Sequence, residues 1–236
     1  MVVRAALIGN RDDTDPGLVG HVLRGHGYSF VEYPREDPSS WTGTDGLDLV
    51  VSLGSSWSTY WPEVSAETGA ERDLLRAAHG AGVPVLGICF GGQQLASALG
   101  GTVQRSQMHE IGWFTVDSLS HKGFPESEVL AGTWFQWHYD RFSVPQGATE
   151  LAASPIGPQA FALGRTLALQ FHPEVTETIV ARWSSGGGAT ELAEAGINRE
   201  ELLERTRALV NHTEPRTAAL VEWFLERAAQ AHETQR

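Results

Sequence analysis

Residues 83–101 read VPVLGICFGGQQLASALGG, and this stretch decides the fold. Its start, VPVLGI, is an apolar run typical of a buried strand, and the segment from Phe90 onward is typical of a helix. Cys89 is the only cysteine of the chain, and Gly87 and Gly91 flank it. Glycines allow a sharp strand-to-helix turn with close backbone packing. The stretch therefore predicts a nucleophile elbow that exposes a thiol at the carboxyl end of a parallel sheet.

The sequence around this elbow alternates short aliphatic runs with longer amphipathic segments. Strands are expected over residues 2–8, 29–33, 47–53 and 83–88, and helices over 18–26 and 66–81. Shorter strands with Gly and Pro between them follow, over residues 112–116, 134–137, 150–153, 159–163 and 166–171. The first pattern is typical of a parallel sheet covered by helices on both faces. We therefore expect an α/β fold of flavodoxin-like type, an open, mostly parallel sheet with a mixed or antiparallel extension.

The C-terminal part of the chain has a helical pattern. A Ser/Gly run at residues 184–188 predicts a turn between helices. The last helix places its apolar residues on one stripe, formed by Leu220, Trp223, Phe224 and Ala228. The segment after the turn is too short to fold alone. We expect a single domain over residues 1–236, with a core over about 2–180 and a helical tail over about 189–232.

Composition and charge narrow the classes of function. Of the 236 residues, 41% are hydrophobic and 19% are charged, as in a globular protein. The formal net charge of −12 repels nucleic-acid phosphates and anionic lipids. Arg4, Asn10 and Arg11 interrupt the first apolar run too early for a signal peptide or a membrane span. We therefore expect a protein that binds neither nucleic acid nor membranes. One cysteine cannot form an internal disulfide, so we also expect a cytoplasmic location.

A nucleophilic thiol needs a base, and His172 is the best placed of the nine histidines. It follows the strand expected over residues 166–171, so it lies at the same carboxyl edge as Cys89. Glu174 is two residues further on and can orient the imidazole as the third member of a triad. A buried, inert Cys89 and a solvated His172 are the alternatives. The elbow glycines and the presence of both groups in one chain favour the triad.

These residues resemble the class I glutamine amidotransferases. That family carries G-x-C-x-G-x-Q at the elbow and H-P-E at the second site, which correspond here to residues 87–93 and 172–174. Further segments match in the expected order, namely Leu53-Gly54-Ser55, EIGW at 110–113, QWHYD at 136–140 and ALQF at 168–171. The chain looks most similar to free-standing members that resemble the glutaminase half of GMP synthase. The resemblance covers about residues 2–180.

The resemblance implies hydrolysis of the γ-amide of L-glutamine through a γ-glutamyl thioester. Cys89 is then the nucleophile, His172 the acid and base, and Glu174 its orienting partner. Gly54 and Phe90 are implied to supply the oxyanion hole. The implied substrate contacts are Ser55, Gln93, Trp113 and His138. No metal or cofactor is implied, and because the sequence contains no G-x-x-x-x-G-K phosphate loop, the implied partner is a separate synthetase that accepts ammonia.

Two features leave the substrate open. Trp57, Tyr60 and Trp61 crowd one loop beside the expected pocket, where they either line the substrate site or cap the sheet edge. In the first case a γ-glutamyl amide or peptide with a larger leaving group is an alternative substrate. His138 and Asp140 have the H-x-D spacing of metal ligands, but no third ligand accompanies them. A silent binding module is the further alternative, and it is disfavoured because all three triad residues are present.

Overall fold

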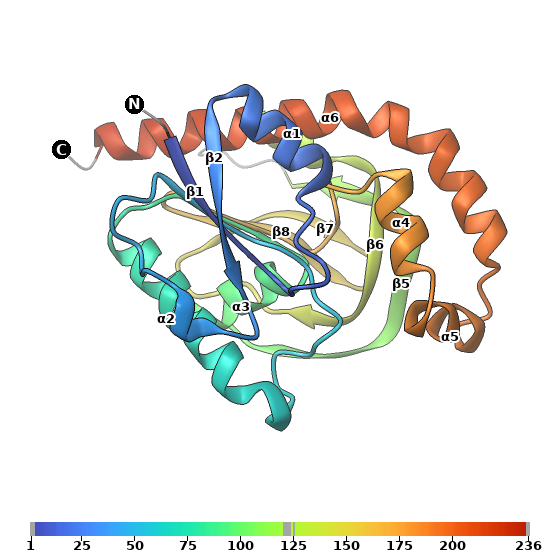
Figure 1. Cartoon of the computed structure of the whole chain (residues 1–236). Coiled ribbons are helices and arrows are strands. Elements are labelled where there is room, and N and C mark those ends of the chain that lie inside the picture. The colour runs from blue at the N-terminus through green and yellow to red at the C-terminus, as the bar shows by residue number, and fades with distance from the viewer. Residues whose placement is uncertain (1–2, 120–123, 125, 235–236) are drawn as a thin grey trace.

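A nine-stranded sheet forms the framework of the computed structural model, which describes residues 3–119, 124 and 126–234 (Figure 1). The strands are β1 (Val3–Gly9), β2 (Tyr28–Pro34), β3 (Leu49–Ser52), β4 (Val85–Ile88), β5 (Val103–Ser118), β6 (Gly132–Phe142), β7 (Thr149–Ser154), β8 (Gly157–Leu163) and β9 (Thr166–Leu169). Their order across the sheet is β2-β1-β3-β4-β9-β8-β7-β5-β6. The first five are parallel, and β8, β7, β5 and β6 continue the sheet in antiparallel pairs. The predicted fold class is therefore confirmed.

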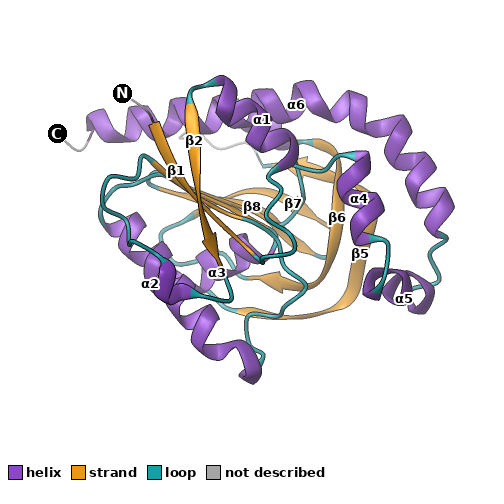
Figure 2. Cartoon of the chain, in the orientation of Figure 1, coloured by secondary structure: helices purple, strands orange, loops and turns teal. Residues whose placement is uncertain are grey.

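Helices cover both faces of the sheet (Figure 2). They are α1 (Gly17–Gly25), α2 (Ser65–Gly80), α3 (Phe90–Ala98), α4 (Glu177–Trp183), α5 (Gly187–Glu194) and α6 (Arg199–Thr234), with short 3-10 helices at Pro38–Ser40, Pro62–Val64 and Ser127–Leu130. Along β1, Ala5 and Leu7 pack toward α1 and α6, whereas Ala6 and Ile8 pack toward α2 and α3. Successive side chains of a strand point to opposite faces, so a strand covered on both sides is a continuous apolar run in the sequence.

The C-terminal helix α6 contributes to the main hydrophobic core. Leu220, Trp223, Phe224 and Ala228, the residues of the expected apolar stripe, are all at most 5% exposed. The first three belong to the same buried cluster as Leu7 and the strands β3, β4 and β9. The segment expected as one tail is two helices, since α5 lies before α6 and begins within the glycine run.

The antiparallel strands β5 and β6 are longer than the sequence predicts. Along β5 only residues 110–113 form a continuous buried run, and most of residues 104–109 are exposed. An exposed ribbon shows little apolar alternation, so the pattern marks only its buried part. Over the ranges that the structure describes, no helix has the length and apolar character needed to cross a membrane.

Candidate active site

Cys89 occupies the corner between β4 and α3 in a backbone conformation that side chains rarely adopt. Its φ is +51° and its ψ is −106°, which costs about 1–3 kcal/mol for a residue other than glycine. The flanking glycines are required by close packing. A Cβ at Gly91 would lie 2.1 Å from the Ser52 carbonyl oxygen, and one at Gly87 would lie 2.6 Å from the Gly91 oxygen. The thiol therefore stands on a strained elbow at the N-terminus of α3, where free N–H groups favour negative charge.

His172 lies beside Cys89 because β9, which precedes it, pairs directly with β4. Its Nδ1 is 2.7 Å from Oε1 of Glu174, and both side chains are buried. Its Nε2 is buried and has no hydrogen-bond partner among the residues that the structure describes. A Cβ built on Gly54 would lie 2.9 Å from Cε1 of His172 and 3.9 Å from Cβ of Cys89. The loop after β3, the elbow and the imidazole thus converge on one point.

The charge on His172 is set by opposing effects. Burial acts to lower the pKa of His172, whereas the carboxylate of Glu174 and the thiolate of Cys89 raise it. The net result is a pKa well above the ordinary value of 6.5. These effects favour the imidazolium form of His172, which is the form that can protonate a leaving amine.

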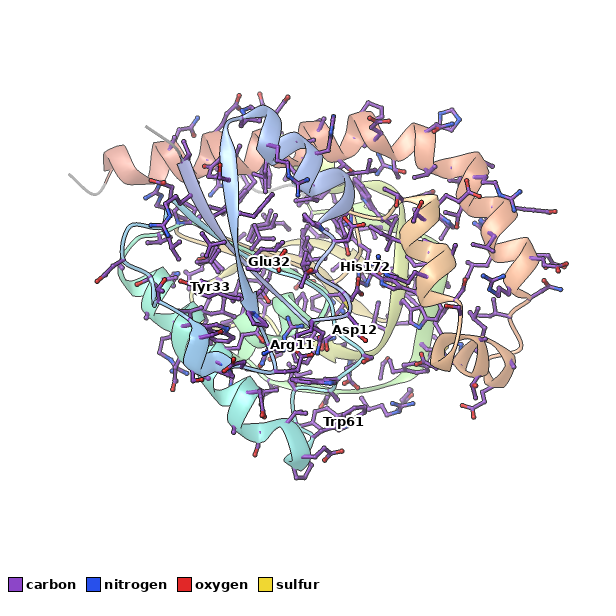
Figure 3. All side chains as sticks on the ribbon, viewed as in Figure 1. Arg11, Asp12, Glu32, Tyr33, Trp61 and His172 are labelled. Atoms are coloured by element: carbon purple, nitrogen blue, oxygen red, sulfur yellow. The ribbon has the colours of Figure 1, made fainter. Side chains whose placement is uncertain are left out.

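A pocket of about 510 Å³ opens over these groups. Figure 3 labels His172, Asp12 and Trp61, which line it from three different segments, Trp61 lying near the start of α2. Besides His172, the wall contains six of the predicted site residues, namely Cys89, Gly54, Ser55, Phe90, Gln93 and His138. Glu174 lies behind His172 instead of in the wall. The structure thus brings together most of the residues that the motifs point to.

Comparison with known proteins assigns the family. Residues 48–181 match the family model described as glutamine amidotransferase class-I. The chain belongs to this family. It is 34% identical to the GMP synthase of Ralstonia pickettii over 178 residues, which is 70% of this chain and 31% of that protein. With the GMP synthase of Paraburkholderia phymatum it is 35% identical over 134 residues, 51% of this chain and 25% of that one. The chain therefore spans about a third or less of these curated relatives.

Solved structures of other amidotransferases share the fold over nearly the whole chain. A glutamine amidotransferase from Thermotoga maritima superposes with a TM-score of 0.83 at 29% identity, covering 97% of this chain and 98% of that one. One from Methylobacillus flagellatus gives 0.76 at 23% identity, with 95% and 94% covered, and shows likeness of fold alone. The resemblance drawn from the elbow and H-P-E motifs is confirmed at the level of the family.

Two polar residues of the amidotransferase pocket are held by the main chain of Asp140. Nε2 of Gln93 donates to the Asp140 carbonyl oxygen at 3.2 Å, and Nδ1 of His138 lies 3.0 Å from the same oxygen. Nε2 of His138 lies 3.2 Å from the carboxylate of Glu110. Both ring nitrogens of His138 are therefore engaged within the protein. Over the ranges that the structure describes, no group of three His, Cys, Asp or Glu side chains is arranged to hold a metal ion.

The structure does not bring Trp113 to the pocket. Its side chain is 3% exposed, its indole N–H donates to Oγ1 of Thr206 at 3.0 Å, and its ring packs edge-on against Phe135 at 5.5 Å. It belongs to the apolar cluster beneath α4 and α6, with Val175 and Leu202. The alternation along β5 directs it to this cluster, so the predicted substrate contact is replaced by a core contact.

The aromatic loop that follows Gly54 forms part of the pocket wall. Trp57 and Trp61 line the pocket, and Tyr60 and Trp61 remain 47% and 40% exposed. The hydroxyls of Ser58 and Tyr60 both donate to the carboxylate of Asp140, the latter at 2.9 Å. The loop is thus tied to β6 and lines the pocket.

No sequence motif marks three further residues around the site. Trp183 packs edge-on against the His172 ring at 4.8 Å, and its indole N–H donates to Asp13 at 2.6 Å. Asn10 accepts a hydrogen bond from Oγ of Ser55 at 2.7 Å. Arg35 lies behind Gly54 and donates to its carbonyl oxygen at 3.2 Å. Each comes from a separate segment, so only the folded chain places it here.

The stability that His172 contributes depends on pH in a defined direction. Because its pKa in the folded state is raised above 6.5, the contribution is complete below pH 6.5 and is lost as the pH rises through the folded value. We expect the free energy of unfolding in urea to fall over that range, by about 1.4 kcal/mol for each unit between the two pKa values. His172→Gln should lack this decline, and an equal decline in both proteins would contradict the expectation.

Proposed function

We propose that this chain hydrolyses the γ-amide of L-glutamine through Cys89, His172, Glu174 and a γ-glutamyl thioester. The observation that carries the proposal is the strained cysteine elbow beside an imidazole whose Nδ1 is held by a buried carboxylate. This arrangement is that of a cysteine nucleophile, its acid and base, and an orienting group. The family supports glutamine as the substrate.

In the first step the proton of the Cys89 thiol passes to Nε2 of His172, and the thiolate sulfur forms a bond with the γ-carbonyl carbon of glutamine. The carbonyl oxygen then becomes an oxyanion, for which Gly54 and Phe90 supply the backbone N–H donors. Over the part of the chain that the structure describes, neither N–H has an acceptor, and both residues line the pocket. Donors already fixed in place stabilise charge that develops during the reaction.

The second step breaks the carbon–nitrogen bond. Nε2 of His172 gives its proton to the departing nitrogen, ammonia leaves, and the thioester remains. Nε2 then takes a proton from water, the resulting hydroxide attacks the thioester, and glutamate leaves. The free Nε2 supports this role, because Glu174 engages only Nδ1. Glu174 also stabilises the imidazolium that forms each time His172 accepts a proton.

We further propose that the ammonia passes to a separate synthetase subunit. The curated relatives are named as glutamine-hydrolysing GMP synthases, and the chain matches only a minor share of their length. The rest of such a protein is where an acceptor-activating region would lie. A reduced thiol nucleophile suits a cytoplasmic location, and we propose that location and a single functional domain for residues 1–236.

The test is glutamate release from L-glutamine by the purified chain, with γ-glutamyl-anilide as a second substrate. Glutamate formation from L-glutamine supports the proposal. Turnover of the anilide without turnover of glutamine supports the second candidate below. Inactivity toward both, even with a synthetase subunit added, would contradict the proposal.

A γ-glutamyl amide or peptide hydrolase is the second candidate, and the aromatic wall favours it. The pocket of about 510 Å³ is lined by Trp57 and Trp61 beyond the reacting thiol. Aromatic rings offer large apolar contact area to a bulky leaving group. The same Cys89 chemistry would apply, with an amine in place of ammonia.

Trp61→Ala separates the two substrates. We expect it to raise the KM for γ-glutamyl-anilide by about 2- to 10-fold, the loss of one aromatic contact, and to leave the KM for glutamine within about 2-fold. Phe114→Ala is the control, because Phe114 is a similarly exposed aromatic side chain, at 37%, outside the pocket wall. Equal changes for both substrates would show that Trp61 does not contact the leaving group.

A further inference from the structure

Arg35 is a fully buried cation beside the oxyanion segments, and the mechanism above does not use it. Its side chain is 0% exposed, and it follows β2, the edge strand of the parallel part. It does not line the pocket. A buried guanidinium is costly unless its charge and its N–H groups are matched. Its partners therefore show what it organises.

The guanidinium joins the ends of neighbouring strands. Nε donates to Glu71 at 2.8 Å and Nη2 to the other carboxylate oxygen at 3.3 Å. Nη1 donates to Oδ1 of Asn10 at 2.7 Å, after β1. After β3, Nη2 donates to the carbonyl oxygen of Leu53 at 3.1 Å, and Nη1 to that of Gly54 at 3.2 Å. Glu71 balances the charge, one bond goes to Asn10, and the other two go to the segment that carries the oxyanion donor.

The contact with Leu53 acts on the donor itself. The Leu53 carbonyl and the Gly54 N–H belong to one peptide unit, and in a planar trans peptide they point in opposite directions. Fixing the carbonyl toward Arg35 therefore aims the N–H of Gly54 away from the guanidinium. Gly54 lines the pocket, whereas Arg35 does not. A cation on the carbonyl also polarises the unit, which strengthens the N–H as a donor.

The same guanidinium contacts the second donor segment. Its central carbon lies 4.6 Å from the centre of the Phe90 ring, in cation–π contact. Phe90 is 1% exposed and begins α3, so its ring and its N–H are fixed together. Arg35 thus touches both residues that carry the oxyanion donors, which come from separate loops.

We propose that Arg35 is the positioning residue of the oxyanion hole and sets the N–H groups of Gly54 and Phe90 relative to each other. The inference rests on the proposed function for its role in glutamine hydrolysis. It predicts that loss of the guanidinium geometry impairs reactions of Cys89 that pass through an oxyanion and spares those that do not.

Two reagents separate these reactions at the only thiol. With p-nitrophenyl acetate, Sγ of Cys89 bonds to the ester carbon through an oxyanion, and p-nitrophenolate leaves. With iodoacetamide, Sγ bonds to the methylene carbon and displaces iodide, and no oxyanion forms. In Arg35→Lys we expect acylation to slow by about 10- to 100-fold. One oxyanion donor accelerates such a reaction by about 10²- to 10³-fold, and misaligned donors lose part of that acceleration. Alkylation should stay within about 2-fold.

Two further variants control for folding. Arg35→Met combined with Glu71→Gln removes both charges and leaves no unpaired buried ion, and it should show the same selective loss. Arg216→Lys is the matched control. The Arg216 guanidinium also donates to main-chain oxygens, such as that of Thr133 at 2.8 Å, and lies 4.1 Å over Trp134, outside the pocket wall. It should leave both rates unchanged.

The ratio of acylation to alkylation decides the outcome. An unchanged ratio in both Arg35→Lys and the double variant would overturn the proposal. This includes an equal fall of both rates, which indicates general loss of the site. If the variants show the expected ratios but the wild-type protein releases no glutamate from glutamine, the result contradicts the proposed function and supports the role of Arg35.

Discussion

Cys89→Ala is expected to reduce glutamate release from L-glutamine by at least about 10⁴-fold, since removing the nucleophile of such a triad leaves only residual catalysis from binding and the oxyanion hole. A coupled glutamate dehydrogenase assay measures the loss. Because the chain has one cysteine, no second thiol can replace it. Mass spectrometry of wild-type protein quenched during turnover should show one γ-glutamyl adduct, and Cys89→Ala should show none.

Cys89→Ser tests whether the loss reflects thiolate chemistry. Serine keeps the size of the side chain and the elbow, but its hydroxyl is a far weaker nucleophile at neutral pH. We expect this variant to be nearly as inactive as Cys89→Ala and to unfold at the wild-type temperature within a few degrees. Glutamate release at more than about a tenth of the wild-type rate by Cys89→Ala would assign the chemistry to another group.

Glu174→Gln is expected to lower kcat by about 10³- to 10⁴-fold. The amide can no longer stabilise the imidazolium or hold the ring in the same tautomer. The carboxylate of Glu174 is also a main cause of the raised pKa of His172, while burial acts in the opposite direction. The substitution should therefore lower the pKa of His172. The alkaline limb of the pH–rate profile, where the proton for the departing nitrogen is lost, should then move to lower pH.

Glu177→Gln is the matched control for this variant. It makes the same substitution three residues away, at an exposed glutamate that pairs with Arg207 at 2.9 Å. An exposed ion pair contributes little, so we expect kcat within about 2-fold of wild type. A loss of less than about 10-fold in Glu174→Gln would remove this residue from the triad.

The elbow and the H-P-E segment were predictable because their physical causes are local. An apolar strand, flanking glycines and a helix start are read from consecutive residues, and parallel strands bring their carboxyl ends to one edge. The same patterns predicted β1 to β4 and their covering helices within a few residues. Nothing beyond the chain neighbours of Cys89 was needed to place it at a corner.

The residues that were misplaced or missed depend on distant partners. Trp113 lies on a strand whose two faces are both partly buried, so its sequence position does not tell whether it faces the pocket or α6. Arg35 follows a weak edge strand, and its partners come from four other segments of the chain. The sequence does not decide whether Trp61 lines the substrate pocket or caps the sheet edge. Its place in the pocket wall depends on a distant contact, the hydrogen bond from Tyr60 of the same loop to Asp140.

The direct pairing of β4 with β9 has a consequence for how the protein is made. Gly87 pairs with Ala168 and Ile88 with Leu169, although the strands β5 to β8 separate them along the chain. During synthesis Cys89 emerges from the ribosome long before His172 and Glu174, so in a nascent chain the thiol lacks these neighbours until β9 docks. Such a long-range contact closes slowly. The onset of ester acylation during refolding would therefore time the insertion of one strand into the middle of the sheet.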